Sequence, residues 1–195
     1  MNGWSEKAAV ARLKSGDIRG LAALVEAHQV KAARAATLIV RDAALAQDIV
    51  QAAFVRFYER IGTYDSTRPF APYFMRMVVN DALAALRKRG RITSLDAPVA
   101  DSEIALEDLL PDPALTPDGA LEQSELRSAV EAALEKLSPE QRAAVVLRYY
   151  LGLSEADMAA SLNVPPGTVK WRLHAAKKQL RTLLSPFRPS PALED

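Results

Sequence analysis

Apolar residues recur at three- and four-residue spacing along most of the chain, which is the period of an amphipathic α-helix. Alanine and leucine are abundant and runs of β-branched residues are short, so the composition favours helix over strand. In the first half of the chain the pattern predicts helices near residues 5–14, 18–39, 43–61 and 70–89. In the second half it predicts a helix near 120–137 and three shorter helices that begin near 139, 155 and 165. We therefore expect an all-α fold.

The stretch between these two groups of helices breaks the pattern. Residues 96–120 read DAPVADSEIALEDLLPDPALTPDGA, and their Pro, Asp and Glu content predicts a flexible acidic linker. The linker would separate two small helical domains, residues 1–95 and 121–184. Residues 185–195 are rich in proline and predict a disordered tail.

The charges follow the same division, although the net charge is only +1. Residues 1–95 contain 15 Lys and Arg against 8 Asp and Glu, and residues 126–195 contain 10 against 7. Residues 96–125 contain 9 acidic residues and no Lys or Arg. Two basic segments joined by an acidic one indicate a polyanionic partner for each end of the chain.

The three short helices of the second domain fit a helix-turn-helix, whose last helix lies in a DNA major groove. The middle helix would pack through Ala156, Ala159 and Leu162. In the last helix, an apolar seam would face the domain: Val169, Leu173, Ala176 and Leu180. The opposite face would carry Lys170, Trp171, His174, Lys177 and Lys178, and the residues from Thr168 to Arg172 would reach base edges or the DNA backbone. A protein-docking module and a plain solvated face remain alternatives.

The helix predicted at 70–89 has a polar stripe on a mostly apolar surface. Tyr73, Arg76, Asn80 and Arg87 lie on one side of it at helical spacing. Aromatic, guanidinium and amide groups in a row suit a single DNA strand, because bases stack on aromatic rings and amides bond base edges. The RKRGR segment (87–91) adds positive charge, and an exposed Tyr64 in the preceding loop would cap a flipped base. An exposed stripe without a ligand is the alternative.

The helix predicted at 43–61 has two different faces. Leu45, Ile49, Ala53 and Phe57 would form a core face. The other face mixes polar and apolar residues, namely Asp48, Gln51, Ala52, Val55 and Glu59. Mixed surface on a long helix is typical of a protein interface, and a solvent-exposed face is the open alternative.

Enzyme and membrane functions find little support in the residues. The chain has no Cys and only two His, so no nucleophile–base pair, metal site or cofactor site is visible. No apolar run reaches the roughly 20 residues that span a bilayer, and the N-terminal segment lacks the pattern of a secretion signal. We expect a cytoplasmic protein that is not an enzyme, binds no metal or cofactor and does not insert into a membrane.

Two segments together resemble the extracytoplasmic-function (ECF) sigma factors, the two-domain class of bacterial transcription initiation factors. Domain 2 of that family is similar to DIVQAAFVRFYERIGTYD (48–65) and RPFAPYFMRMVVNDALAALRKRGR (68–91). Domain 4 is similar to LEKLSPEQRAAVVLRYYLGLSEADMAASLNVPPGTVKWRLHAAKKQLR (134–181). The resemblance covers about residues 20–91 and 121–182, and its second part is the more specific.

The resemblance implies a role for each surface. The set expected to recognise and melt the −10 element, and to hold a flipped base, is Tyr64, Tyr73, Arg76, Asn80, Arg87, Lys88, Arg89 and Arg91. The set expected to bind the −35 element is Thr168, Lys170, Trp171, Arg172, His174, Lys177 and Lys178. Asp48, Gln51, Ala52 and Val55 would dock on the clamp coiled coil of the largest subunit of core RNA polymerase. The flap of the polymerase and an anti-sigma protein are further implied partners, and the acidic linker would run through the polymerase cleft.

The sequence departs from the family pattern at four positions on the helices that carry these surfaces. Ala52 stands where an acidic residue usually follows the Gln of the clamp-binding motif, and Tyr73 stands where Trp is common. Trp171 replaces a small residue and Ala175 a common Arg, so we expect an unusual −35 preference. A decoy that binds an anti-sigma protein without directing transcription is the alternative, but the retained cations of RKRGR and KWRLHAAKK favour a working sigma factor.

Overall fold

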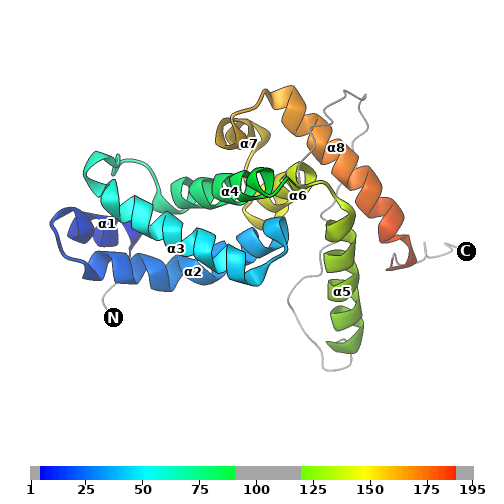
Figure 1. The fold of residues 1–195 in the computed structure, drawn as a ribbon, viewed down its shortest axis with the longest axis horizontal. Helices are drawn as coiled ribbons and strands as arrows, with labels where there is room; N and C mark the ends of the chain where they lie inside the picture. The colour runs from blue at the N-terminus through cyan, green and yellow to red at the C-terminus, as the bar shows by residue number, and fades with distance from the viewer. Residues whose placement is uncertain (1–4, 91–119, 188–195) are drawn as a thin grey trace, which may run out of the picture. The chain divides into compact units, whose positions relative to one another are not determined.

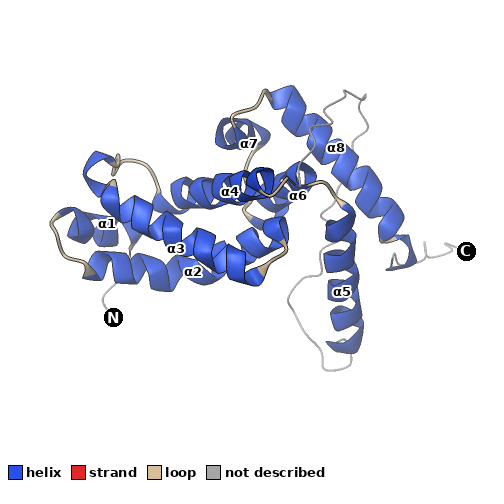
Figure 2. Ribbon diagram, viewed as in Figure 1, coloured by secondary structure: helices blue, strands red, loops and turns tan. Residues whose placement is uncertain are grey.

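The computed structural model describes residues 5–90 and 120–187 (Figure 1). Throughout these ranges the regular structure is helical and no strand occurs, so the predicted all-α class is confirmed (Figure 2). The chain divides into two compact units, Met1–Thr93 and Ser94–Asp195, which are described separately. Residues 96–119 of the expected linker lie outside the described ranges, as do 188–195 of the expected tail. The start of that tail, Ser185–Phe187, forms a 3₁₀ turn, η5.

The first unit is a bundle built around one long central helix. Its elements are α1 (Glu6–Lys14), α2 (Arg19–Val40), α3 (Ala43–Glu59), the 3₁₀ turn η1 (Ile61–Thr63) and α4 (Phe70–Lys88). Helix α2 contacts α1, α3 and α4, and α3 also packs on α4. The largest fully buried side chains include the aromatic rings Phe57, Phe70 and Phe74. The core therefore lies where α2, α3 and α4 converge.

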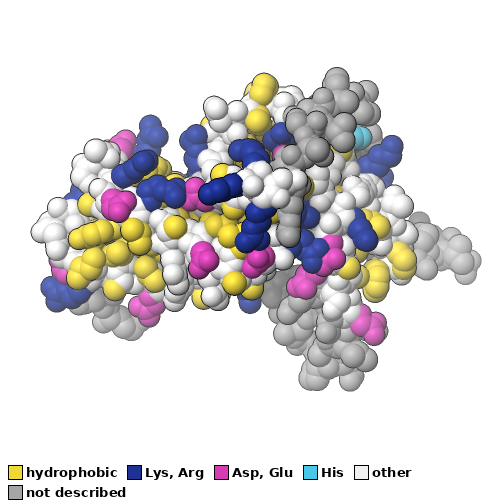
Figure 3. Space-filling view, in the orientation of Figure 1, with side chains coloured by type: hydrophobic (Ala, Val, Ile, Leu, Met, Phe, Trp, Pro, Cys, Tyr) yellow, Lys and Arg dark blue, Asp and Glu magenta, His cyan; other side chains and the backbone are white. Residues whose placement is uncertain are grey.

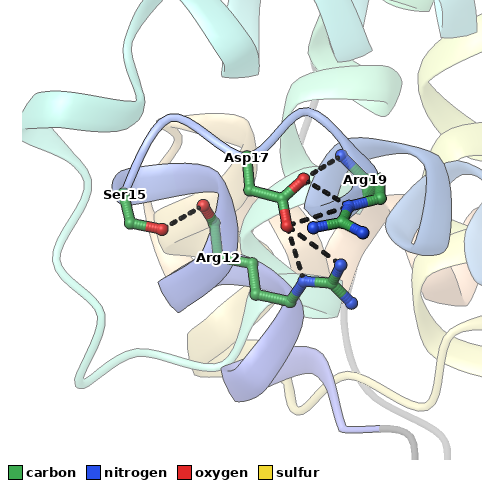
Figure 4. Close-up of polar contacts among 4 residues, drawn as sticks. All are labelled: Arg12, Ser15, Asp17 and Arg19. Carbon is green, nitrogen blue, oxygen red and sulfur yellow. Dashed lines mark hydrogen bonds and ion pairs between the residues drawn. The ribbon is translucent and has the colours of Figure 1, made fainter.

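A tight polar joint connects α1 to α2 (Figure 4). The carboxylate of Asp17 accepts hydrogen bonds from Arg12 Nη2 at 2.9 Å and from Arg19 Nε at 2.9 Å. These two guanidinium groups hold the pKa of the Asp17 carboxyl well below its usual range. Asp17 also accepts from the backbone N–H of Arg19. The joint fixes the direction in which α2 leaves α1.

Close packing of α1 on α2 depends on a glycine. Gly20 is buried in the first turn of α2. A Cβ atom added there would lie 2.7 Å from the backbone nitrogen of Leu13 and would also collide with the carbonyl oxygen of Ala9. The two helix backbones therefore approach more closely than any larger residue permits.

The second unit contains the three helices predicted to begin near 139, 155 and 165, but the last of them, with 18 residues, is long and not short as predicted. Its elements are α5 (Ala120–Lys136), α6 (Pro139–Val145), the π-helical turn η4 (Val146–Tyr150), α7 (Glu155–Leu162) and α8 (Pro166–Leu183). Helix α8 contacts α5, α6 and α7. Ser138 and Gln141 form a reciprocal capping box at the start of α6, and the hydroxyl of Ser154 caps α7. These caps explain why the helices begin where the sequence predicts.

The packing of α7 differs from the prediction in one respect. Met158 and Ala159 are buried, whereas Ala156 is exposed and Leu162 is half-buried. The prediction chose residues at three-residue spacing, namely Ala156, Ala159 and Leu162. Met158 instead fills the space against the rest of the unit, with an exposed fraction of 0%.

Candidate nucleic-acid interfaces

The polar stripe of α4 lies on the accessible side of the helix. Arg76 and Arg87 are exposed, and Tyr73 and Asn80 are half-buried. The opposite side is sealed, since Phe74 and Val78 are both 0% exposed. The geometry of the stripe is therefore confirmed. Figure 3 shows Lys and Arg side chains in dark blue along the surface that α3 and α4 form.

The expectation that Tyr64 is exposed is wrong. Its side chain is 6% exposed, and its hydroxyl donates a hydrogen bond of 2.8 Å to the carbonyl oxygen of Arg68. Burial raises the pKa of the Tyr64 phenol, and the nearby Glu6 carboxylate adds to the effect, so the hydroxyl remains a donor. The loop before α4 folds back on itself, and the ring turns inward where the sequence pattern suggested an outward position.

Tyr64 and Tyr73 form the edge of an aromatic cluster. Their ring centroids are 4.9 Å apart, and Tyr64 packs edge-on to Phe57 at 5.2 Å. Phe57 in turn meets Phe70 at 4.8 Å. Tilted and edge-to-face pairs at these distances are favourable aromatic contacts. Tyr73 thus rests on buried rings while part of its own ring reaches the surface.

The basic end of α4 contains exposed cations and one cation that forms an ion pair. Arg87 and Lys88 are exposed. Arg89 forms an ion pair with Asp42 through Nη1 and Oδ2 at 3.0 Å. Asp42 also caps α3 by accepting from the N–H of Leu45, and these contacts together lower the pKa of its carboxyl. Arg89 therefore joins the end of α4 to the start of α3, and Arg91 lies outside the described residues.

The mixed face predicted on α3 is accessible. Asp48, Gln51, Ala52 and Val55 are all exposed, with Val55 at 56%. The next residue, Arg56, is half-buried and turns toward α4, where both oxygens of Asp81 accept from its Nη1 at 2.8 and 2.9 Å. The outer face of α3 is thus fixed relative to the polar stripe of α4 by an inter-helix ion pair.

In the second unit, the predicted seam of α8 is confirmed. Val169, Leu173, Ala176 and Leu180 are all buried. Lys170 and Lys178 are exposed, and Thr168 and His174 are half-buried. The amino-terminal half of α8, which follows the α7–α8 turn, therefore presents cations and polar groups beside a buried seam, as a recognition helix requires.

Two residues of the predicted −35 set are less accessible than expected. Arg172 is only 8% exposed, so its guanidinium is not offered to a base edge. It lies on the flank of the buried seam and is itself among the buried residues of α8. Trp171 is half-buried rather than exposed, and its Nε1 is shielded from solvent without a hydrogen-bond partner among the described residues.

Lys177 is also turned toward its own domain. Its Nζ lies 5.9 Å from the ring centroid of Tyr149, a cation–π contact between α8 and η4. The sequence pattern gave no sign of Tyr149, because the contact depends on the π-helical turn that brings this ring to the flank of α8.

The sequence analysis also missed Glu6 and His28, which contact each other at 3.1 Å between Glu6 Oε1 and His28 Nε2. Helical spacing places His28 on the buried side of α2, but it cannot show that α1 supplies a carboxylate to it. Within the described ranges no group of three or more His, Asp and Glu side chains is arranged to hold a metal ion, and no helix is long and apolar enough to cross a bilayer.

Comparison with family models gives two matches. The model for sigma-70 region 2 matches residues 24–92, and the model for sigma-70 region 4 matches residues 127–180. The first segment contains α3 and α4, and the second contains α7 and α8 as far as residue 180. Both candidate surfaces therefore lie inside matched segments.

Curated relatives match over nearly the whole chain. The RNA polymerase sigma-H factor of Pseudomonas aeruginosa is 30% identical over 184 residues, which cover 91% of this chain and 93% of that protein. The ECF RNA polymerase sigma factor SigW of Bacillus subtilis is 31% identical over 182 residues, covering 91% and 97%. Among solved structures, that of CnrH in complex with the cytosolic domain of CnrY has a similar fold, with a TM-score of 0.61 at 23% identity over 94% of this chain and 99% of that one.

Proposed function

Because the chain belongs to the extracytoplasmic-function class of the sigma-70 family, we propose that it binds core RNA polymerase and directs initiation at promoters with two recognition elements. One observation carries the proposal. Each family-matched segment presents an accessible helix face with cations and polar side chains, α4 in the first unit and α8 in the second. Two such faces on separate units suit two separate stretches of DNA.

In this proposal the stripe of α4 recognises and melts the −10 element. Tyr73 stacks on an unpaired base, Asn80 bonds a base edge, and Arg76 and Arg87 contact the strand backbone. Tyr64 cannot itself cap a base, because its ring is buried. Its role in this proposal is to support the ring of Tyr73. Lys88 adds electrostatic attraction, while Arg89 contributes mainly through its ion pair with Asp42.

The exposed side of α8 reads the −35 element in duplex form. Lys170 and Lys178 neutralise phosphates, and Thr168 in the first turn reaches a base edge. His174 and Trp171 flank this surface, and their partial exposure allows contact at the groove. Arg172 and Lys177 support α8 through packing with the domain, and Lys177 does so through the ring of Tyr149.

The outer face of α3 is the proposed contact with core polymerase. Asp48 and Gln51 offer polar groups and Val55 an apolar centre, which together fit a helical partner of mixed character. Ala52 can make no polar contact, so the interface is expected to depend more on Val55. The second unit would contact the flap of the polymerase.

An anti-sigma protein is a further proposed partner. The solved structures with a similar fold include CnrH with the cytosolic domain of CnrY, and RpoE from Bartonella quintana with the anti-sigma factor NepR. A partner that covered the outer face of α3 would block the contact with core polymerase proposed above.

The test is transcription by the purified chain with a bacterial core polymerase. Transcripts made from genomic DNA are sequenced from their 5′ ends, with core polymerase alone as the control. We expect new start sites that share two upstream motifs. Binding to core polymerase without any specific start site would contradict the proposal and favour a decoy that only sequesters an anti-sigma protein.

A further inference from the structure

Three helices of the first unit meet at one carboxylate, that of Glu6 in α1. Its Oε1 lies 3.1 Å from Nε2 of His28 in α2, and its Oε2 accepts a hydrogen bond of 3.4 Å from the backbone N–H of Ala71 in α4. His28 is 9% exposed, and its ring lies 5.2 Å from that of Phe70, the first residue of α4. Glu6 and His28 therefore contact the first two residues of α4, Ala71 and Phe70 respectively.

The start of α4 needs such a partner because its own sequence provides none. The residue before the helix is Pro69, which makes no side-chain cap, and the first turn contains no acidic residue. The first N–H groups of a helix lack internal acceptors, and the helix dipole favours a negative charge beside them. Glu6 supplies both the acceptor and the charge from a different helix.

The same turn carries the base-stacking residue of the proposed function. Tyr73 follows Ala71 by two positions and rests on Tyr64, whose ring is 4.9 Å away. The Glu6 carboxylate is close enough to Tyr64 to raise the pKa of its phenol further. A change in the direction of this first turn would move Tyr73 relative to Asn80, which lies about two turns farther along α4.

We infer that Glu6 is a positioning residue for promoter melting, and that His28 orients it. The pair sets the direction of the first turn of α4 so that Tyr73 and Asn80 meet the unpaired strand together. The inference rests on the proposed function of α4, and it assigns to α1 a role in DNA opening although α1 carries none of the proposed DNA contacts.

The experiment uses holoenzyme reconstituted with Glu6→Ala and a duplex promoter obtained from the transcript mapping above. Fluorescence of a 2-aminopurine base in the −10 element separates the affinity of the closed complex from the rate of opening. We expect the opening rate to fall about 2- to 30-fold, the range of a lost helix cap, with closed-complex affinity within about twofold of wild type. Glu26→Ala is the matched control, because Glu26 is an exposed glutamate of α2 and the charge change is the same.

A second variant covers the case in which Glu6→Ala folds poorly. Glu6→Gln keeps the size and one acceptor oxygen but loses the charge, so we expect a smaller fall in the opening rate with an unchanged melting temperature. If both variants lower affinity and rate together, in step with a lower melting temperature, Glu6 is merely structural and the inference is wrong.

Tyr73→Ala and Asn80→Ala separate this inference from the function beneath it. If these variants slow opening while both Glu6 variants open normally, the positioning role is refuted and the proposed function of α4 stands. If Tyr73→Ala and Asn80→Ala also open normally, α4 does not melt the promoter and both proposals fail.

Discussion

The indole of Trp171 combines two properties that rarely occur together. It lies on the side of α8 opposite the buried seam, yet its Nε1 is shielded from solvent and has no hydrogen-bond partner among the described residues. A buried N–H without an acceptor costs about 1–3 kcal/mol. A residue kept at such a cost is a candidate for a contact that forms only when a partner binds.

Trp171→Ser should therefore change the −35 preference and leave −10 melting intact, because α4 belongs to the other unit. Single-round transcription from a panel of promoters that differ only in the −35 element measures the change. Trp171→Phe is the control that removes only the indole N–H. We expect its free energy of unfolding to equal that of the wild type or to be slightly higher. If Trp171→Ser leaves promoter choice unaltered, Trp171 makes no contact that selects the −35 element.

His28 makes the stability of the first unit depend on pH. Burial lowers the pKa of His28 below its ordinary value of 6.5, and the Glu6 carboxylate opposes this only in part. As the pH falls below 6.5, the unfolded chain takes up a proton at this residue before the folded chain does. The free energy of unfolding should therefore fall between about pH 7.5 and pH 5.5.

Urea denaturation followed by circular dichroism at several pH values measures this dependence. His28→Gln removes the titrating group, and its stability should change less over the same range. If the stability of the wild type rises on acidification, the Glu6 contact outweighs burial, and the pKa of His28 is raised in the folded chain and not lowered.

At single positions, helical periodicity correctly predicted the exposure of residues whose surroundings are set by their own helix. It failed where a second helix sets those surroundings. The seam of α8 and the stripe of α4 follow from spacing alone. Tyr64 was misplaced because its environment is built by rings from α3 and α4. Arg172 was misplaced because the spacing puts it at the margin of a buried face, where packing decides its exposure.

Among the elements, the contact between α1 and α2 is the most sensitive to a small change. A Cβ at position 20 would meet the backbone of α1, which cannot move as a flexible side chain can. Gly20→Ala should destabilise the first unit by about 1–3 kcal/mol, the usual cost of overpacking. Because α1 also carries Glu6, the variant should slow promoter opening as well.

Thermal unfolding of Gly20→Ala and Gly62→Ala provides the comparison. A Cβ at Gly62 would have no neighbour within 4 Å, so Gly62→Ala should be neutral or slightly stabilising. Equal melting temperatures for the two variants would show that α1 can shift away from α2 without loss.

The helix boundaries followed the sequence where a cap was present. Helices α6 and α7 follow the caps Ser138 and Ser154 and so begin near the predicted residues 139 and 155, and Asp42 caps α3. Three elements were not predicted: the 3₁₀ turn η1 after α3, the π-helical turn η4 after α6 and the 3₁₀ turn η5 after α8. All three depend on backbone hydrogen-bond shifts at the end of a helix, which leave no signal in the spacing of apolar residues.

At the scale of the whole molecule, the two helices proposed to contact DNA, α4 and α8, belong to separate compact units. In the proposed function, the Lys and Arg residues of each unit would give that unit its own affinity for DNA. Residues 96–125, between the two basic segments, are acidic. The central claim is therefore that the two helices act independently. Helix α4 recognises one promoter element and α8 recognises the other, and a substitution in one helix leaves recognition by the other helix unchanged.

The most direct test selects promoters from a library in which both elements are randomised. Holoenzymes containing the wild type, Asn80→Ala or Thr168→Ala transcribe the library, and the sequenced transcripts give the preference at every position. The account predicts that Asn80→Ala relaxes the preference only within the −10 element and Thr168→Ala only within the −35 element. The account is contradicted if Asn80→Ala alters the preference within the −35 element or Thr168→Ala alters it within the −10 element. It is also contradicted if neither variant changes the preference at either element.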